Sequence, residues 1–238
     1  MSRTRLLPAL PAGVWLLASA CGPGAATPMP QPPAFELERV GQPETIPAYE
    51  GDNVQIVGGP GTVPARATVR VINLDQPMQA AAADAFDSGA FSVSVFVTSG
   101  QELRFEWVQG TERSAPADAF FIKADPAQPA FELQPSPRFD CLELSPPYAL
   151  EFSEAGSATL TVTNSCDDAL TLANPRARIG LPAFTLPTEL PALAPGDSTE
   201  LVVDFDGGNP AALDEDTLLF DVTLGAETIR YPITLRAP

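Results

Sequence analysis

The residues that could do chemistry in this chain are three cysteines and several groups of carboxylates. The cysteines are Cys21, Cys141 and Cys166. The acidic groups are Asp167-Asp168, Asp204 with Asp206, and Asp214-Glu215-Asp216. Histidine is absent, so imidazole metal sites and histidine-dependent catalytic triads are excluded.

The carboxylates allow more than one interpretation. Calcium prefers six to eight oxygen ligands, which these groups could supply, but no EF-hand spacing is present. Paired carboxylates also hydrolyse glycosides, yet neither spacing nor an aromatic platform distinguishes a pair. We therefore expect a solvated acidic face that keeps the protein soluble. We predict no catalytic residue, no cofactor and no metal ligand, and a calcium-dependent adhesin remains the alternative.

Overall charge and composition narrow the class of protein. The 238 residues include 13 Lys+Arg and 30 Asp+Glu, a net charge of −17. This charge argues against a nucleic-acid binder, which needs cationic side chains to replace counterions at phosphate. Hydrophobic residues make up 45% of the chain, enough for a packed core. The 27 prolines and 17 glycines favour short strands over long helices.

The N-terminal segment is typical of export. A basic stretch, Met1–Arg5, precedes an apolar run over residues 6–20 that is too short to span a bilayer comfortably. Leu17-Ala18-Ser19-Ala20 places small residues directly before Cys21. This pattern resembles the lipobox of bacterial lipoproteins, although Ala18 stands where leucine is usual. An ordinary secretory signal with an incidental cysteine is the alternative.

The lipoprotein resemblance implies a membrane anchor. Residues 1–20 would be the signal peptide, and the lipidation site, Cys21, would receive diacylglycerol on its thiol and an acyl chain on its freed amine. Gly22 lacks the aspartate associated with retention at the inner membrane, which favours the outer membrane or the cell surface. Gly22–Pro33 has no hydrophobic period and is rich in proline. We predict residues 21–38 to be an extended tether.

The other two cysteines then form an even pair in an exported protein. We predict a disulfide between Cys141 and Cys166 that closes a loop of about 25 residues and contributes roughly 3 kcal/mol. Two buried free thiols are the alternative. A metal site is disfavoured because two sulfurs without histidine leave the coordination incomplete.

Period-two alternation predicts a first β domain over residues 39–126. Inward positions alternate with outward ones along residues 67–72, 91–97 and 103–108. Trp107 stands at an inward position, which favours a core residue over a ligand platform. The run Asp84–Phe91 resembles the hairpin of bacterial Ig-like repeats, which implies an Ig-like β-sandwich.

Residues 127–138 are the predicted linker. Pro33–Leu37 recurs as Pro129–Leu133, each time just before a predicted domain. We interpret both copies as a short lead-in strand or plug.

The second predicted domain covers residues 139–238. Alternation is clear over residues 158–163 and 201–206, and two further strands flank Gly225-Ala226-Glu227 as a hairpin. Tyr231 is expected in the core, and Pro232 suggests that the last strand lies at a sheet edge. Leu160–Asn164, followed by Leu193–Ser198, resembles the ASPM/Hydin-like family of Ig-like domains, akin to major sperm protein. Members of that family are interaction modules without catalytic residues.

Taken together, the sequence predicts an all-β chain with two Ig-like sandwiches in tandem. We expect a non-enzymatic, lipid-anchored cell-envelope protein acting as a binding or structural module. Its expected partners are the membrane, through acyl chains on Cys21, and an envelope protein or glycan, but not nucleic acid. A subunit of a larger envelope complex is a further alternative.

Overall fold

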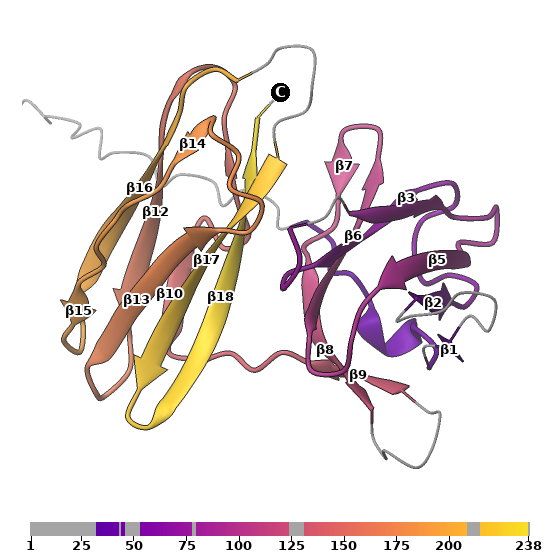
Figure 1. Cartoon of the computed structure of the whole chain (residues 1–238), viewed down its shortest axis with the longest axis horizontal. Coiled ribbons are helices and arrows are strands. Elements are labelled where there is room, and N and C mark those ends of the chain that lie inside the picture. Colours follow the sequence, from indigo (N-terminus) through magenta and orange to yellow (C-terminus); the bar gives the residue numbers. More distant parts are fainter. Residues whose placement is uncertain are drawn as a thin grey trace, which may run out of the picture. The chain divides into compact units, whose positions relative to one another are not determined.

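The computed structural model describes residues 32–42, 44–45, 53–77, 80–123, 131–208 and 215–237. The predicted signal peptide, Cys21 and residues 22–31 lie outside this part of the chain. Residues 32–238 form one compact unit. The described residues contain no α-helix, and their only helical element is the three-residue 3-10 helix η1 (Leu37–Arg39). The predicted all-β class is confirmed (Figure 1).

The first sandwich consists of two antiparallel sheets, coloured indigo to magenta in Figure 1. The smaller sheet has the order β1-β2-β5, with β1 (Glu44–Thr45), β2 (Asn53–Gly58) and β5 (Phe91–Phe96). The larger has the order β4-β3-β6-β8-β9, with β3 (Thr68–Asn73), β4 (Ala81–Asp84), β6 (Glu102–Gln109), β8 (Ala117–Lys123) and β9 (Phe131–Pro135). A short strand, β7 (Glu112–Arg113), pairs with β6.

The core of the first sandwich follows the predicted alternation. Val69 and Val71 of β3, Val93 and Val95 of β5, and Trp107 of β6 are all buried in one cluster. Period-two spacing places such side chains on one face of each strand, and this face is turned toward the opposite sheet.

The second sandwich also has two sheets. One has the order β10-β12-β16-β14, with β10 (Leu142–Ser145), β12 (Gly156–Asn164), β14 (Phe184–Thr185) and β16 (Ser198–Phe205). The other has the order β11-β18-β17-β13-β15, with β11 (Ala149–Glu151), β13 (Leu170–Ala177), β15 (Ala192–Leu193), β17 (Glu215–Leu224) and β18 (Glu227–Arg236). β11 runs parallel to β18, and the other pairings are antiparallel.

The predicted hairpin joins β17 to β18, which pair from Leu224 with Glu227 to Glu215 with Arg236. Gly225 has a φ of 60° in the turn, a conformation that glycine adopts without a steric cost. The predicted edge position of Pro232 is wrong, because β18 lies between β11 and β17. Proline is tolerated because β11 pairs only with Thr234–Arg236, leaving the backbone at Pro232 unpaired on that side.

The predicted tether and linker both include residues that belong to the first sandwich. Phe35 is only 4% exposed and packs in the core against Phe91 and Phe105. Phe131, in β9, stacks on Phe121 with 4.5 Å between ring centroids. The two copies of the repeated segment therefore close the same core. It is the packing of the Phe35 and Phe131 rings that attaches each segment to the first sandwich. The composition of the two segments does not predict this packing.

Candidate functional site: a buried ionic interface between the sandwiches

Both faces of the central strand β6 are buried. Leu103 and Phe105 point into the core, as predicted from their parity. The alternate side chains Glu102, Arg104 and Glu106 are only 1–2% exposed. Charged residues are almost never buried to this extent unless they are paired, so this face of β6 must meet another charged surface.

That surface is the outward face of the β17–β18 hairpin of the second sandwich. Thr217 and Leu219 of β17, and Thr234 of β18, are 2–3% exposed although they point away from their own core. Leu219 forms a small apolar cluster with Ile72 and Leu74 of the first sandwich. The two larger sheets therefore contact each other through their outward faces. We call this contact the ionic interface, after its charged residues: Arg70, Asp75, Glu102, Arg104, Glu106, Asp118, Arg138, Glu215, Arg230 and Arg236.

Arg104 is one of the deeply buried charges of the ionic interface, with only 2% of its surface exposed. Its Nε and Nη2 donate to the two carboxylate oxygens of Asp118 at 2.8 and 2.9 Å. The same guanidinium donates across the interface to the Pro232 carbonyl at 2.7 Å and to the Thr234 hydroxyl at 3.0 Å. The Pro232 carbonyl that Arg104 binds lies beside the start of β11, where β18 has no strand partner on that side.

The pKa of Asp118 shows which influence dominates at this position. Burial by itself raises the pKa of a carboxyl group, but the opposite charge and hydrogen bonds of Arg104, with those of Arg138, outweigh burial and lower the pKa of Asp118. The carboxylate is therefore held in its ionised form.

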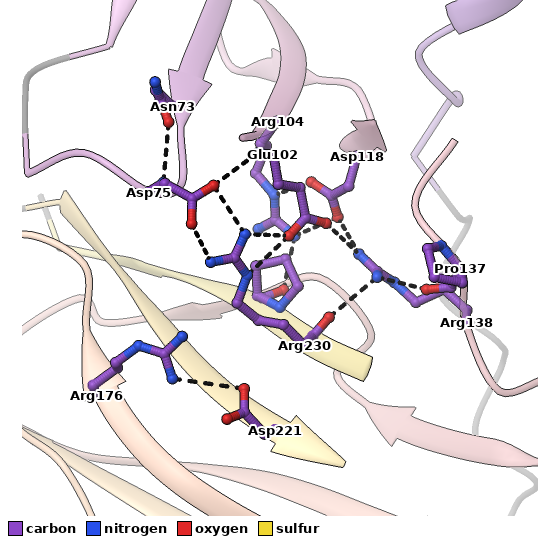
Figure 2. Close-up of polar contacts among 11 residues, drawn as sticks. Asn73, Asp75, Glu102, Arg104, Asp118, Pro137, Arg138, Arg176, Asp221 and Arg230 are labelled. Carbon is purple, nitrogen blue, oxygen red and sulfur yellow. Dashed lines mark hydrogen bonds and ion pairs between the residues drawn. The ribbon is translucent and has the colours of Figure 1, made fainter. Parts of the chain in front are cut away.

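A second group of ion pairs is centred on Arg230 of β18 (Figure 2). Its Nε and Nη2 donate to one oxygen of Glu102 at 2.9 and 2.7 Å, and its Nη1 donates to Asp75 at 2.6 Å. Arg138, in the connection between the sandwiches, donates to Asp118 at 2.7 Å and to the Arg230 carbonyl at 3.2 Å. These contacts bring β6, β8, β18 and the connecting segment together.

A third group of ion pairs joins β3 to the hairpin. Arg70 donates to Glu106 at 2.7 Å and to Glu215 of β17 at 2.5 and 3.0 Å. Arg236 contacts Glu215 at 3.3 Å and Glu151 at 2.5 Å. Despite burial, hydrogen bonds and charges from Arg70 and Arg236 lower the pKa of Glu215.

The physical role of such a network is to fix geometry. Removing ions from water costs several kcal/mol each, so a buried ion pair adds little net stability compared with apolar packing. Separating the partners is costly, however, because it leaves charges buried without compensation. The bidentate pairs also restrict orientation. The ionic interface therefore favours one particular arrangement of the two sandwiches.

The structure places the predicted site residues in several environments. Cys141 and Cys166 form the predicted disulfide, which ties the start of β10 to the loop after β12. Asp167 and Asp168 are exposed next to it. Asp204 accepts a hydrogen bond from Ser157, and Asp206 accepts one from the Gly208 amide. Asp214 lies outside the described residues.

The expected solvated acidic face is wrong for Glu215 and Asp216. Glu215 is part of the ionic interface, and Asp216 is only 1% exposed. The Asp216 carboxylate accepts hydrogen bonds from the backbone amides of Ile179, Gly180 and Leu181 at 2.9–3.0 Å. The sequence predicted the wrong environment for these two carboxylates, because a run of acidic residues does not show which hydrogen-bond donors surround it in the folded chain.

Sequence reasoning also missed the ionic interface itself. The sequence held one signal for it. Residues 102, 104 and 106 are all charged and lie on one face of a strand whose opposite face is wholly apolar. Arg230 and Arg236 follow the same outward parity in the final strand. Nothing in either strand alone shows that the two charged faces meet.

Within the described ranges, no three His, Cys, Asp or Glu side chains are grouped so that they could hold a metal ion. The same residues include no helix with the length and apolar character needed to cross a membrane.

Comparisons with known proteins give distant similarities only. No protein-family model and no curated protein matches the chain. Among solved structures, the VesB protease of Vibrio cholerae has 14% identity and a TM-score of 0.31. The similarity covers 74% of this chain and 63% of that one, so it spans less than two thirds of the protease. A protein of unknown function from Porphyromonas gingivalis W83 has 16% identity and a TM-score of 0.32, over 85% of this chain and 97% of the other. The BSP domain of a biofilm associated protein has 14% identity and a TM-score of 0.20, over 83% and 29% of the two chains.

Proposed function

We propose that this protein is a non-enzymatic, lipid-anchored protein of the cell envelope, in which the two Ig-like sandwiches act as one rigid binding or structural module. The observation that carries the proposal is the ionic interface. It uses buried, ion-paired side chains to hold two sandwiches in one arrangement, which suits a module that must present a surface at a defined distance and angle.

The disulfide supports an extracytoplasmic location, because such bonds persist in oxidising compartments.

The net charge of the chain determines whether it could bind a membrane directly. Without residues 1–20, which include Arg3 and Arg5, the net charge is 11 − 30 = −19. Anionic headgroups repel such a chain, so stable membrane association requires acyl chains or a protein partner. Cys21 is the residue that would carry the acyl chains.

The anchor is tested with Cys21→Ser. We expect the unprocessed precursor to accumulate, because lipoprotein maturation needs the modified thiol before cleavage, while the wild-type protein partitions into non-ionic detergent. The matched control is Cys141→Ser combined with Cys166→Ser, which removes the disulfide and leaves the anchor intact. Wild-type protein recovered in the aqueous phase with an unmodified N-terminus would contradict the anchor.

The absence of enzymatic activity is tested on the purified chain from Gly22 onward. We expect no turnover in a panel of peptidase, esterase and glycosidase substrates. Turnover that disappears on substitution of a single Asp or Glu would refute the non-enzymatic proposal.

Rigidity is tested separately by measuring the distance between spin labels placed on the two sandwiches, which should show one narrow distribution at neutral pH.

A further inference from the structure

The strand β5 lies at the end of the smaller sheet of the first sandwich, so one of its edges has no strand partner in the described part of the chain (Figure 1). Its six residues, Phe91–Phe96, include neither a charged residue nor a proline. Proteins usually protect an edge strand with charges, proline or a very short length, because its unpaired backbone groups can pair with another chain. β5 has none of these protections.

The other edge strands among the described residues are all protected. Six of them carry a carboxylate, which is Glu44 in β1, Asp84 in β4, Glu112 in β7, Glu132 in β9, Glu143 in β10 and Glu151 in β11. The other two, β14 and β15, have only two residues each. In a chain with a net charge of −17, β5 is therefore the described edge that can approach another strand without a carboxylate.

The hydrogen bonds of β2 show which backbone groups of β5 face this free edge. The Val57 carbonyl accepts from the Gly41 amide at 2.8 Å, on the side of β2 that carries β1. Val57 therefore directs its backbone groups away from its β5 partner, Ser92. Because such pairs alternate along an antiparallel ladder, Ser92, Ser94 and Phe96 all direct their N–H and C=O groups toward the free edge.

Two contacts limit the free edge at its ends. The Phe86 amide donates to the Ala90 carbonyl at 2.8 Å, and the Asn73 side-chain amide donates to the Phe96 carbonyl at 2.9 Å. Between these contacts, the backbone groups that Ser92 and Ser94 direct outward have no hydrogen-bond partner among the described residues. Another strand is the ligand whose own backbone matches such a row of donors and acceptors.

Exposed apolar side chains gather beside the same edge. Four large hydrophobic side chains are exposed in the described part of the chain, and three of them are Val57, Phe86 and Phe96, at 41%, 64% and 39%. Phe96 ends β5, Val57 is the β2 residue opposite Ser92, and Phe86 lies in the turn before β5. Exposed apolar groups next to unpaired backbone are typical of an interaction surface.

We propose that β5 pairs antiparallel with β5 of a second copy of this chain, about a two-fold axis at Ser94. In this register Ser94 faces its own equivalent, and Ser92 faces Phe96 of the second copy. Every outward backbone group of these residues then meets a complementary group, since antiparallel pairing of identical strands is symmetric. The Phe96 ring of the second copy lies in one row with Ser92 and Val57, where the small serine side chain leaves room for it.

The distribution of charge favours a second copy as the occupant. Neither β5 nor its neighbour β2 contains a charged residue, so no carboxylates oppose each other near the axis. Acidic residues elsewhere on the two copies repel, but salt screens charges that are more than about 8 Å apart at physiological ionic strength. The contact is small, so we expect a weak dimer. This inference goes beyond the proposed function and does not depend on the lipid anchor.

The test is sedimentation velocity of the chain from Gly22 onward, from micromolar to millimolar concentration. We expect a monomer–dimer equilibrium in which the dimer fraction rises with concentration and also with added salt, because salt screens the repulsion between acidic copies. Monomers at every concentration and salt level would overturn the proposal. A dimer that dissociates on addition of salt would also overturn it, since that behaviour indicates ion pairs across the contact.

Ser94→Glu places two carboxylates opposite each other at the axis and should weaken the dimer roughly tenfold or more. Its melting temperature should match that of the wild type, because the Ser94 side chain is exposed. Val202→Glu is the matched control, since it adds the same charge at a side chain that is 42% exposed on the second sandwich. Equal dimerisation of Ser94→Glu and Val202→Glu would contradict the assigned edge.

Ser94→Cys tests the register without adding charge. The chain from Gly22 onward has no other free thiol, because Cys141 and Cys166 form a disulfide. Facing residues of a hydrogen-bonded antiparallel pair have Cα atoms about 5.5 Å apart, within the range of a disulfide. Mild oxidation should therefore cross-link Ser94→Cys into a dimer much faster than Val202→Cys. Equal cross-linking rates of these two variants would overturn the proposed two-fold axis.

Discussion

At the scale of single residues, the position of Arg104 is the clearest departure from a surface strand. Its guanidinium makes four hydrogen bonds, two to Asp118 of its own sheet and two to the backbone and hydroxyl of the facing strand. These contacts show that Arg104 links the two sandwiches as well as two strands of its own sheet. Because Arg104 is buried, the loss of one partner has a large expected effect.

We predict that Arg104→Met destabilises the protein by about 3 kcal/mol, because Asp118 loses its bidentate partner in a buried setting. Urea unfolding followed by fluorescence measures the change. Arg66→Met is the control, since Arg66 pairs with Asp87 and both side chains are 79% exposed. An exposed pair of this kind contributes less than about 1 kcal/mol.

Pairing the first variant with Asp118→Leu separates a lost charge partner from lost packing. The double variant should regain much of the stability, because it removes the buried carboxylate that Arg104→Met leaves with Arg138 as its remaining partner. Equal stabilities of Arg104→Met and the double variant would contradict this explanation.

At the scale of elements, the two copies of the repeated segment differ in how deeply they enter the first sandwich. Phe35 precedes a 3-10 turn and lies fully inside the core, whereas Phe131 begins an edge strand and is only partly buried. The backbone confirms this attachment, since the Phe35 amide donates to the Ala115 carbonyl at 3.2 Å.

We predict that Phe35→Ala lowers the free energy of unfolding by about 3–5 kcal/mol, the usual cost of emptying a buried aromatic site. Phe131→Ala should cost clearly less because its ring is already partly exposed. Thermal unfolding of both variants gives the comparison. A neutral effect of Phe35→Ala would mean that the segment is a tether after all.

The disulfide also acts at the level of elements, since it links β10 to the loop that follows β12. We predict that Cys141→Ser with Cys166→Ser lowers stability by about 3 kcal/mol, the value expected for closing a loop of this length. Adding reductant to the wild type should reproduce the loss, whereas reductant should not affect the double variant. A reductant effect on the double variant would show that another process is responsible.

At the scale of the whole molecule, the ionic interface makes the coupling between the sandwiches depend on pH. Asp75, Asp118 and Glu215 all have a lowered pKa. In each case burial opposes the shift, and arginine partners outweigh it. A carboxyl group whose pKa is lower in the folded state stabilises that state above its unfolded pKa, which is about 4. This contribution is lost as the pH falls through the lowered, folded value.

We therefore predict one cooperative thermal transition at about pH 7 and two separate transitions once the pH falls well below about 4. Calorimetry across this range measures the change, and hydrogen exchange at Thr217 and Leu219 reports whether the interface has opened. Salt at neutral pH should have little effect, because buried pairs are weakly screened. Two transitions already present at neutral pH would contradict the coupling.

The strands of both sandwiches could be predicted because burial of one face imposes period two on the sequence. Val69, Val93, Leu160 and Phe220 all occupy the inward positions that alternation assigns. The disulfide could also be predicted from the sequence, since two cysteines in an exported chain have few other roles. The limits of the tether and of the linker were harder to predict from the sequence. Phe35 and Phe131 belong to no periodic pattern, and their positions depend on the space in the core that each ring fills.

The sequence by itself determined the all-β class, the inward faces of the strands and the cysteine pair. The tertiary structure alone decided where the outward charges lie. Glu102, Arg104 and Glu106 form the same pattern whether water or an opposing set of charges surrounds them, because either environment can stabilise an ionised side chain. Only the contact between β6 and the β17–β18 hairpin distinguishes the two cases, and it joins residues more than 100 positions apart.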